Sequence, residues 1–235
     1  MDILEAGRTN YRSIMRNALL AVGPRLSNST IANLQRTLSY LELGRWCAGQ
    51  SGGRRRLQSF PADRDLFALA LTHVRGTRPL YLEFGVYEGE SMRWWSEHLT
   101  ALEARLIGFD SFKGLPEAWR GLGVGHFVTA GPPTFDDPRV SFVQGWFDDT
   151  LPPFDPPEHD QLIVNIDCDL YSSTATVLER IERWLVPGSL LYFDELSDRD
   201  HEMRALFESV IRTGARLRPL GWAQGLHWLF LVEEP

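Results

Sequence analysis

Four acidic side chains follow two apolar segments in the second half of the chain. Asp167 and Asp169 flank Cys168 after the run at residues 162–167, while Asp194 and Glu195 follow the run at residues 190–194. If these runs are adjacent parallel strands, about 4.8 Å apart, the acids converge. A hard divalent cation such as Mg²⁺ takes oxygen ligands and would relieve their repulsion. It would also clamp a substrate hydroxyl and lower the pKa of that hydroxyl. Helix caps or arginine pairs are the structural alternatives.

A glycine-containing turn follows an earlier apolar run. Residues 83–89 read acid-x-Gly-x-x-x-Gly, where Gly85 permits a sharp turn and Gly89 a close approach of the backbone to a ligand. The dinucleotide pattern Gly-x-Gly-x-x-Gly, which places a pyrophosphate on a helix N-terminus, is absent. Glu83 would repel a pyrophosphate but attract an ammonium group. An amino-acid-bearing cofactor such as S-adenosylmethionine matches that charge, although glycines also serve ordinary tight turns.

Asp110 strengthens this cofactor prediction. It ends the next apolar run, where a carboxylate can accept hydrogen bonds from both ribose hydroxyls of an adenosine group. Capping of a helix is the alternative role. Two aromatic residues after the third run could stack on adenine or simply pack. The residues expected to bind the cofactor are Glu83, Gly85, Gly89, Ser91, Asp110, Ser111, Trp146 and Phe147.

The elements that must position these residues alternate regularly from about residue 61. Continuous apolar strands separated by helices indicate a parallel sheet that is covered on both faces. Ligands bind outside the carboxyl ends of such strands. The two last strands, joined by a short glycine-containing link, predict an antiparallel hairpin. We expect seven strands, at residues 80–85, 106–110, 140–143, 162–167, 190–194, 217–220 and 226–232.

Helices are expected between these strands and before them. The clearest carries an apolar face from Val177 to Leu185 and stops at Pro187-Gly188. Two further helices are expected at residues 91–102 and 200–213. The first 60 residues differ, with helices at residues 4–22 and 30–43 and a break at residues 49–53. The predicted fold is therefore a doubly wound, seven-stranded, mostly parallel α/β sheet (61–235) with an N-terminal helical extension or lid (1–60).

Composition limits the partners and the compartment. The 235 residues have a hydrophobic fraction of 43% and a net charge of −7, typical of a globular protein without attraction to nucleic acid or anionic membranes. Arg54, Arg55 and Arg56 suggest a solvated turn. Cys47 and Cys168 are too few for a disulfide framework, and Cys168 is expected to pack. Neither a signal peptide nor a membrane span is evident, so a cytoplasmic protein is expected. Tryptophan and leucine residues of the extension would suit a homodimer.

Three segments in order resemble the macrocin O-methyltransferase family. They are residues 109–117, 143–152 and 166–174, within a likeness that covers roughly residues 80–232. Members methylate sugar hydroxyls in natural-product biosynthesis. The resemblance implies a class I S-adenosylmethionine-dependent sheet, a small hydroxyl-bearing substrate, and a Mg²⁺ site on Asp167, Asp194 and Glu195. The family usually has Gly at position 168 and commonly Asp at position 195, so the detailed metal geometry differs here.

The identity of the general base is open. Related catechol-type enzymes use a lysine shortly after the first metal ligand, but Leu170 and Tyr171 occupy that region and the only lysine is Lys113. Asp167, Asp169 or His201 would serve, or the metal alone. The predicted catalytic residues are Asp167 and His201, with a structural role as the alternative for a lone histidine.

Three other functions compete with this O-methyltransferase prediction. A metal-independent N- or C-methyltransferase would leave the acids structural. A nicotinamide-dependent oxidoreductase could use a similar sheet, although its glycine pattern is missing. A catalytically silent binding module would have no need for the unpaired acids.

Overall fold

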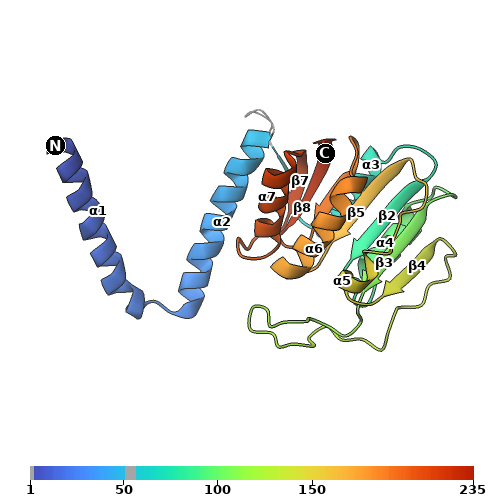
Figure 1. Cartoon of the computed structure of the whole chain (residues 1–235), viewed down its shortest axis with the longest axis horizontal. Helices are drawn as coiled ribbons and strands as arrows, with labels where there is room; N and C mark the ends of the chain where they lie inside the picture. Colours follow the sequence, from blue (N-terminus) through green and yellow to red (C-terminus); the bar gives the residue numbers. More distant parts are fainter. Residues whose placement is uncertain (1–2, 51–56) are drawn as a thin grey trace.

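The computed structural model describes residues 3–50 and 57–235. In these residues eight strands form one sheet in the order β1-β7-β8-β6-β5-β2-β3-β4 (Figure 1). All strands run parallel except β8, which is antiparallel to both β6 and β7. The strands are β1 (Gln58–Phe60), β2 (Pro79–Phe84), β3 (Arg105–Asp110), β4 (Val140–Gln144), β5 (Gln161–Ile166), β6 (Leu190–Phe193), β7 (Arg216–Ala223) and β8 (His227–Glu234).

Helices cover both faces of the sheet. The alternation along β2 explains the two layers, because Leu80, Leu82 and Phe84 face one core and Tyr81 faces the other. The first core also receives α2, α6 and α7, and the second receives α3 and α4. The helices are α1 (Ile3–Val22), α2 (Asn28–Gln50), α3 (Asp63–His73), α4 (Glu90–His98), α5 (Phe147–Thr150), α6 (Tyr171–Ile181) and α7 (Glu202–Thr213), with short 3₁₀ turns η1 (Gly23–Arg25) and η2 (Glu182–Trp184).

The predicted doubly wound sheet and its terminal antiparallel pair are confirmed, with one strand more than expected. The extra strand, β1, is three residues long and ends directly before Pro61. It pairs with β7, with Ser59 opposite Trp222, so the last residues of the expected extension join the sheet. A segment this short carries no readable alternation, and only pairing with an existing edge identifies it as a strand.

Two helix boundaries also differ from expectation. Helix α4 ends at His98 rather than at residue 102, because the Arg139 guanidinium binds the carbonyl oxygens of Ser96, Leu99 and Ala101. Helix α2 continues through Gly49 to Gln50, while the rest of the expected break and Arg54–Arg56 lie outside the described residues.

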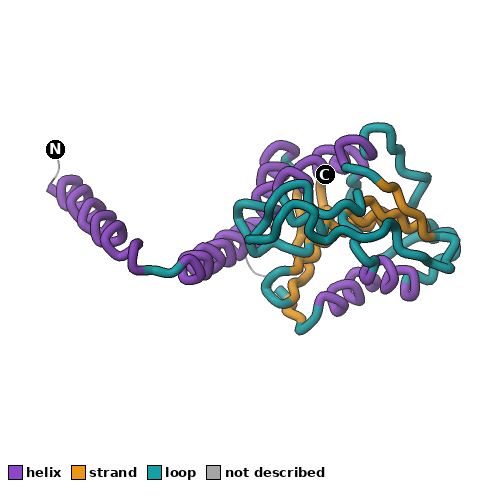
Figure 2. Tube along the Cα trace, turned by 90° about the horizontal axis from the view of Figure 1, so that it is seen from below, coloured by secondary structure: helices purple, strands orange, loops and turns teal. Residues whose placement is uncertain are grey.

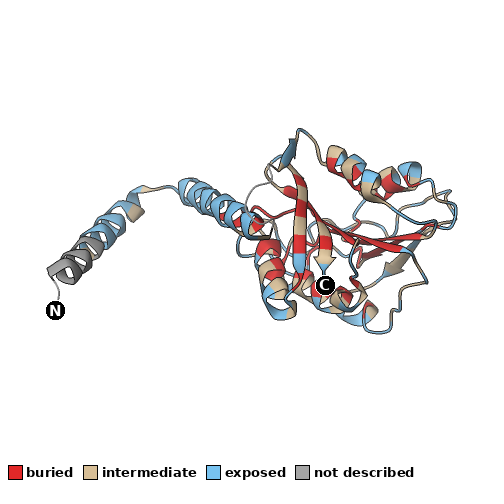
Figure 3. Ribbon diagram, turned by 90° about the horizontal axis from the view of Figure 1, so that it is seen from above, coloured by how far each residue is buried: buried red, intermediate tan, exposed pale blue. Residues whose placement is uncertain are grey.

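The two N-terminal helices form an open V in Figure 1, and the tube view shows them extending from one end of the domain (Figure 2). In the burial view, α2 is exposed along most of its length and the sheet domain contains most of the buried residues (Figure 3). Among the described residues, no helix combines the length and the apolarity that crossing a bilayer requires.

Candidate active site

A cavity of about 800 Å³ opens at the carboxyl edge of the sheet. From β2 the chain proceeds outward through β3 to β4 and then returns to β5 on the other side of β2. Such a reversal leaves a crevice beyond the strand ends, and ligands of open α/β sheets bind there. Gly85 follows β2 and Asp167 follows β5, and both residues line the cavity. The volume is within the range of sites that hold small molecules.

The turn after β2 requires glycine at its first position. Gly85 has a φ of +89°, a conformation that residues with a Cβ rarely adopt. A Cβ atom there would overlap the carbonyl oxygen of Asp167. Gly89 has a φ of +77° and precedes α4, although it does not line the cavity. The glycine spacing therefore shapes the turn, and Gly85 lets β2 and β5 lie close together at the site.

Asp110 uses its carboxylate to hold the same turn. Its Oδ2 atom accepts hydrogen bonds from the backbone N–H groups of Val86 (2.8 Å) and Tyr87 (2.9 Å), and Oδ1 accepts one from Phe112 (2.7 Å). A carboxylate has about four acceptor positions. Asp110 lines the cavity together with Ser111, so one acceptor position remains for a ligand hydroxyl. This arrangement leaves room for one of the two predicted ribose contacts, because three acceptor positions of Asp110 hold the backbone of the turn.

Glu83 lies beneath the cavity instead of on its wall. Its side chain is on the Tyr81 side of β2, accepts hydrogen bonds from the hydroxyls of Tyr81 (2.5 Å) and Ser91 (2.6 Å), and is 0% exposed. Direct contact with a cofactor ammonium group, as expected from the sequence, does not match this position. Period-two alternation turns the side chain under α4. Burial raises the pKa of Glu83 to about 7, although the two hydroxyl donors oppose the shift.

Glu83→Gln should remove a pH dependence from the stability of the protein. The raised pKa means that, between about pH 4.5 and 7, the folded state holds a proton that the unfolded state has lost. Stability therefore falls as pH rises through this window, by on the order of 3 kcal/mol, and the glutamine variant lacks that loss. Urea unfolding of both proteins from pH 5 to 8 measures the difference. Parallel stability curves would show that Glu83 does not titrate in this way.

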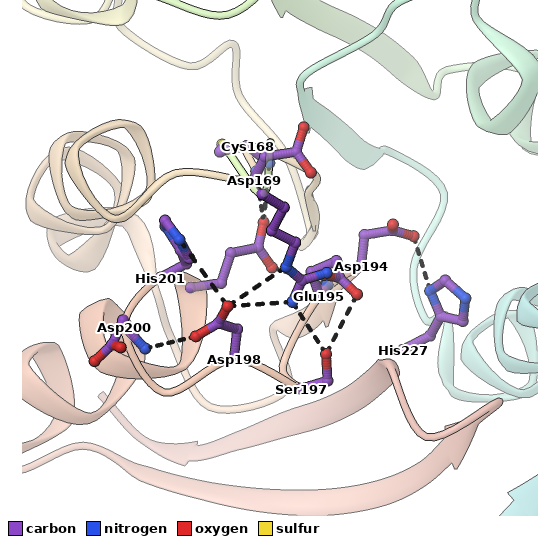
Figure 4. A network of polar contacts seen from close by, with 11 residues as sticks. Cys168, Asp169, Asp194, Glu195, Ser197, Asp198, Asp200, His201 and His227 are labelled. Atoms are coloured by element: carbon purple, nitrogen blue, oxygen red, sulfur yellow. Dashed lines mark hydrogen bonds and ion pairs between the residues drawn. The ribbon is translucent and has the colours of Figure 1, made fainter. Parts of the chain in front are cut away.

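The acids at the ends of β5 and β6 divide into free and paired groups (Figure 4). Asp194 lies 2.8 Å from Nδ1 of His227, and Glu195 forms an ion pair with Arg120. Asp167 and Asp169 have no side-chain hydrogen bond or ion pair among the described residues, and both line the cavity. Burial raises the pKa of Asp167 well above its usual range, and Asp194 and Asp169 add to this; burial and the same kind of repulsion raise the pKa of Asp169 to about 7.

Glu202 joins the two acid-bearing loops. This residue begins α7, is 0% exposed, and accepts hydrogen bonds from three backbone N–H groups. Oε1 receives those of Cys168 (3.0 Å) and Asp169 (3.2 Å), and Oε2 receives that of Glu195 (3.0 Å). The carboxylate thus sets the spacing between the end of β5 and the end of β6. Sequence analysis missed this role because the three donors are main-chain groups distant in sequence.

Glu202→Gln should lower the free energy of unfolding by about 2–3 kcal/mol, because the amide NH₂ would face the N–H of Glu195 and leave a buried donor unpaired. Glu208→Gln is the matched control, since Glu208 makes the same exchange on the exposed side of α7, where the cost is usually below about 1 kcal/mol. Urea unfolding compares the two variants. Equal losses would contradict the anchoring role of Glu202.

The residues predicted to hold Mg²⁺ match the metal in chemistry but not in arrangement. Asp167, Asp194 and Glu195 offer the oxygen atoms that Mg²⁺ prefers. Within residues 3–50 and 57–235, however, no three acidic, histidine or cysteine side chains are placed to hold an ion. His227 engages Asp194 and Arg120 engages Glu195. The metal prediction is therefore not confirmed.

The remaining predicted residues separate by position. Trp146 and Phe147 line the cavity, whereas His201 and Ser91 do not. His201 stands beside Asp198, 4.0 Å from its carboxylate, at the start of α7. Cys168 is buried, as expected for a packing residue. The cavity also has a wall whose individual residues were not predicted from the sequence, formed by Tyr87, Trp119, Arg120, Phe127, Asp148, Ser172, Ser173 and Thr176.

Three of the eight residues of this wall are aromatic. Tyr87 and Phe127 meet edge to face with ring centroids 5.4 Å apart, and the Arg120 guanidinium lies over Trp119. Three of these residues belong to the long segment between β3 and β4, whose sequence shows no periodicity. The sequence did contain one signal for this wall, namely the aromatic residues in the segment that follows Asp110 at the end of β3.

Known proteins resemble this chain in the region that forms the cavity. Residues 82–196 match the family model described as a methyltransferase domain, which spans the chain from β2 to the acids after β6. Over 76 residues the chain is 34% identical to the 8-demethyl-8-(2,3-dimethoxy-alpha-L-rhamnosyl)-tetracenomycin-C 4'-O-methyltransferase of Streptomyces olivaceus. That match covers 30% of this chain and 28% of the relative, so it spans less than a third of either protein.

Solved structures share the fold. The calicheamicin methyltransferase CalS11 superimposes with a TM-score of 0.56 at 23% identity, covering 71% of this chain and 76% of that one. The O-methyltransferase NovP gives a TM-score of 0.53 at 19% identity, covering 73% and 77%. The cavity of the present chain lies within the region that matches the family model. Residues 82–196 are thus similar to a methyltransferase domain, and the predicted class of fold is the one that these solved structures share.

Proposed function

We propose that this protein is an S-adenosylmethionine-dependent O-methyltransferase that acts on a hydroxyl group of a small molecule such as a natural-product sugar, as in the macrocin O-methyltransferase family. The observation that carries the proposal is the presence of Asp167 and Asp169, whose carboxylates have no side-chain partner within residues 3–50 and 57–235, in the same cavity as the cofactor candidates Asp110 and Trp146. The partial relative from Streptomyces olivaceus, whose name describes 4'-O-methylation of a rhamnosyl compound, supports this choice.

The proposed cofactor site uses the part of the cavity near β2 and β3. Gly85 would leave room for the amino-acid portion, Asp110 and Ser111 would bind the ribose, and Trp146 with Phe147 would contact the adenine. When bound, S-adenosylmethionine supplies an electrophilic methyl group on a sulfonium sulfur. The acceptor would occupy the part lined by Tyr87, Trp119 and Phe127, whose aromatic faces suit the apolar face of a sugar and exclude water.

Asp169 is the proposed general base. Its carboxylate would accept the proton of the acceptor hydroxyl, and bound S-adenosylmethionine would supply the methyl group to the hydroxyl oxygen and leave as S-adenosylhomocysteine. Asp194 already contacts His227, Glu195 is paired with Arg120, and His201 does not line the cavity. Burial and neighbouring acids raise the pKa of Asp167 well above its usual range, whereas the pKa of Asp169, raised to about 7, suits a general base near neutral pH. Positioning of the two reactants supplies much of the remaining rate.

Two measurements test the proposed function. The first is calorimetric titration with S-adenosylhomocysteine, for which we expect tight binding. The second is transfer of labelled methyl groups from S-adenosylmethionine to a panel of sugars and phenols. Methyl transfer to a hydroxyl supports the proposal. Absence of S-adenosylhomocysteine binding at high micromolar concentration would overturn it, and transfer to nitrogen or carbon acceptors alone would favour the N- or C-methyltransferase.

We also propose that Mg²⁺ binds to the three acids at the ends of β5 and β6. An ion on Asp167, Asp194 and Glu195 would have to compete with Arg120 for Glu195, so Arg120→Gln should bind Mg²⁺ more tightly than the wild type. Calorimetric titration of Mg²⁺ measures this, with Asp194→Ala expected to lose the signal. If neither the wild type nor Arg120→Gln binds Mg²⁺, the three acids are not metal ligands and the metal-independent reaction is favoured.

A further inference from the structure

The N-terminal extension contains apolar surface that its own domain does not cover. Only the C-terminal half of α2 is anchored, by the buried side chains of Leu43 and Cys47 and by Trp46, which packs against Phe207 with ring centroids 5.1 Å apart. From residue 13 to residue 38 no side chain is buried. Helix α1 contacts mainly the adjoining η1, and the V that it forms with α2 is open (Figure 1).

Helix α2 has two apolar stripes on opposite sides. Ser39, Leu43 and Cys47 follow one another every four residues and face the domain. Ile31, Leu34, Leu38 and Leu41 have the spacing 3-4-3 and are 37–66% exposed. At about 100° per residue, this second stripe lies roughly opposite the first and spans about 80° of the helix. It therefore points away from the domain, toward the side on which α1 lies (Figure 1).

The 3-4-3 spacing of the exposed stripe on α2 indicates what kind of surface would cover it. A helix lying on a globular core has an apolar stripe at least about 100° wide, whereas a strict 3-4 spacing is the narrower seam of helix-on-helix packing. Helix α1 adds a face with Ile14, Met15, Leu19 and Val22, each 43–66% exposed. A single helix of this length is marginally stable in water without a partner for its apolar face. Another helix is the expected partner.

We propose that the extension is a dimerisation arm, in which α1 and α2 of one chain pack against α1 and α2 of a second copy. The stripe is available on every copy, so the interface can be self-complementary about a two-fold axis. The eight large apolar side chains of these two faces are about half exposed. They represent on the order of 500 Å² of apolar surface, and with the polar rim about 800 Å² per copy, the size of a stable interface.

The arm and the domain carry net charge of opposite sign. Residues 1–50 contain six arginines against three acidic residues, whereas residues 51–235 contain 18 basic and 28 acidic residues. Because both arms of a dimer would be basic, charge does not hold them together, and the apolar stripes must supply the attraction.

Sedimentation equilibrium of the full chain tests the arm. We expect a dimer in the wild type, and we expect Leu38→Glu to raise the dimer Kd by about 100-fold or more, because the symmetric interface would bury two unpaired carboxylates. Leu38 is half exposed within one chain, so the new carboxylate meets water in the monomer and the domain should still fold. Circular dichroism and S-adenosylhomocysteine binding check folding.

Asn33→Glu is the matched control. It adds the same charge to an exposed position on the same helix, but outside the 3-4-3 stripe. The wild type and Asn33→Glu should dimerise equally. A monomeric wild type at about 100 µM overturns the proposal, as does equal weakening by both substitutions. Binding of a monomeric wild type to vesicles of anionic phospholipid, lost in Leu38→Glu, would assign the stripe to a membrane surface instead.

Discussion

Asp169→Asn should lower kcat by about 10²- to 10⁴-fold while changing the affinity for S-adenosylhomocysteine by less than about threefold. Asparagine has nearly the shape of aspartate but cannot take a proton from an acceptor hydroxyl. The side chain of Asp169 lines the cavity, and its own backbone N–H is held by Glu202 at 3.2 Å, so the substitution should leave the loop in place. Methyl transfer under saturating cofactor and S-adenosylhomocysteine calorimetry separate the two effects.

Asp200→Asn controls for the loss of one negative charge near this edge of the sheet. Asp200 is exposed and does not line the cavity. We expect its kcat to remain within about twofold of the wild type, as for surface substitutions in general. If Asp169→Asn keeps more than a third of the wild-type kcat, the proton has another acceptor. A full loss in Asp167→Asn with activity retained in Asp169→Asn would identify Asp167 instead.

Gly85→Ala should destabilise the protein by about 3 kcal/mol or more and weaken cofactor binding by about 100-fold or more. Two costs combine. An alanine at a φ of +89° is strained, and its Cβ would overlap the carbonyl oxygen of Asp167. That oxygen cannot retreat easily, because the N–H of Asp167 is hydrogen-bonded to the carbonyl of Phe84 at 2.9 Å. The ends of β2 and β5 would have to separate, which distorts the cavity.

Gly188→Ala separates the two costs of this substitution. Gly188 has a φ of +96°, but nothing lies within 4 Å of the Cβ that alanine would add. It should therefore cost only about 1 kcal/mol, from the backbone conformation. Urea unfolding and S-adenosylhomocysteine calorimetry on both variants provide the comparison. If Gly85→Ala is no worse than Gly188→Ala, the close approach of Gly85 to Asp167 has no consequence for the site.

Much of the fold could be predicted because it depends on local patterns. The apolar runs that became β2, β3, β5 and β6 are buried on both faces of the sheet, and a buried parallel strand must be apolar throughout. The residues that follow such strands meet at one edge in any arrangement of the sheet. Gly85, Asp110, Asp167 and Asp194 could therefore be placed near one cavity from the sequence, and all four line it.

The direction in which each side chain points could not be predicted as well from the sequence. Glu83 and Gly85 are two residues apart, yet Glu83 lies beneath α4 and only Gly85 reaches the cavity. Asp194 and Glu195 are adjacent, yet one meets His227 and the other Arg120. Those partners come from β8 and from the segment between β3 and β4. No local pattern predicts contacts between segments 33 and 75 residues apart in the chain.

The amino-acid order therefore determined which chemistry gathers at the carboxyl edge, because hydropathy and glycine content specify strands, turns and their ends. Only the tertiary structure decided which acids are free and which are paired, since pairing depends on long-range contacts such as that of Arg120 with Glu195. It also showed that Glu202 accepts hydrogen bonds from three main-chain N–H groups. Every residue type except proline has such a group, so the sequence does not indicate which ones bind. The same reason applies to the dimerisation arm. The sequence of α2 contains two stripes, but only the structure shows that one of them packs against the domain and the other faces away from it.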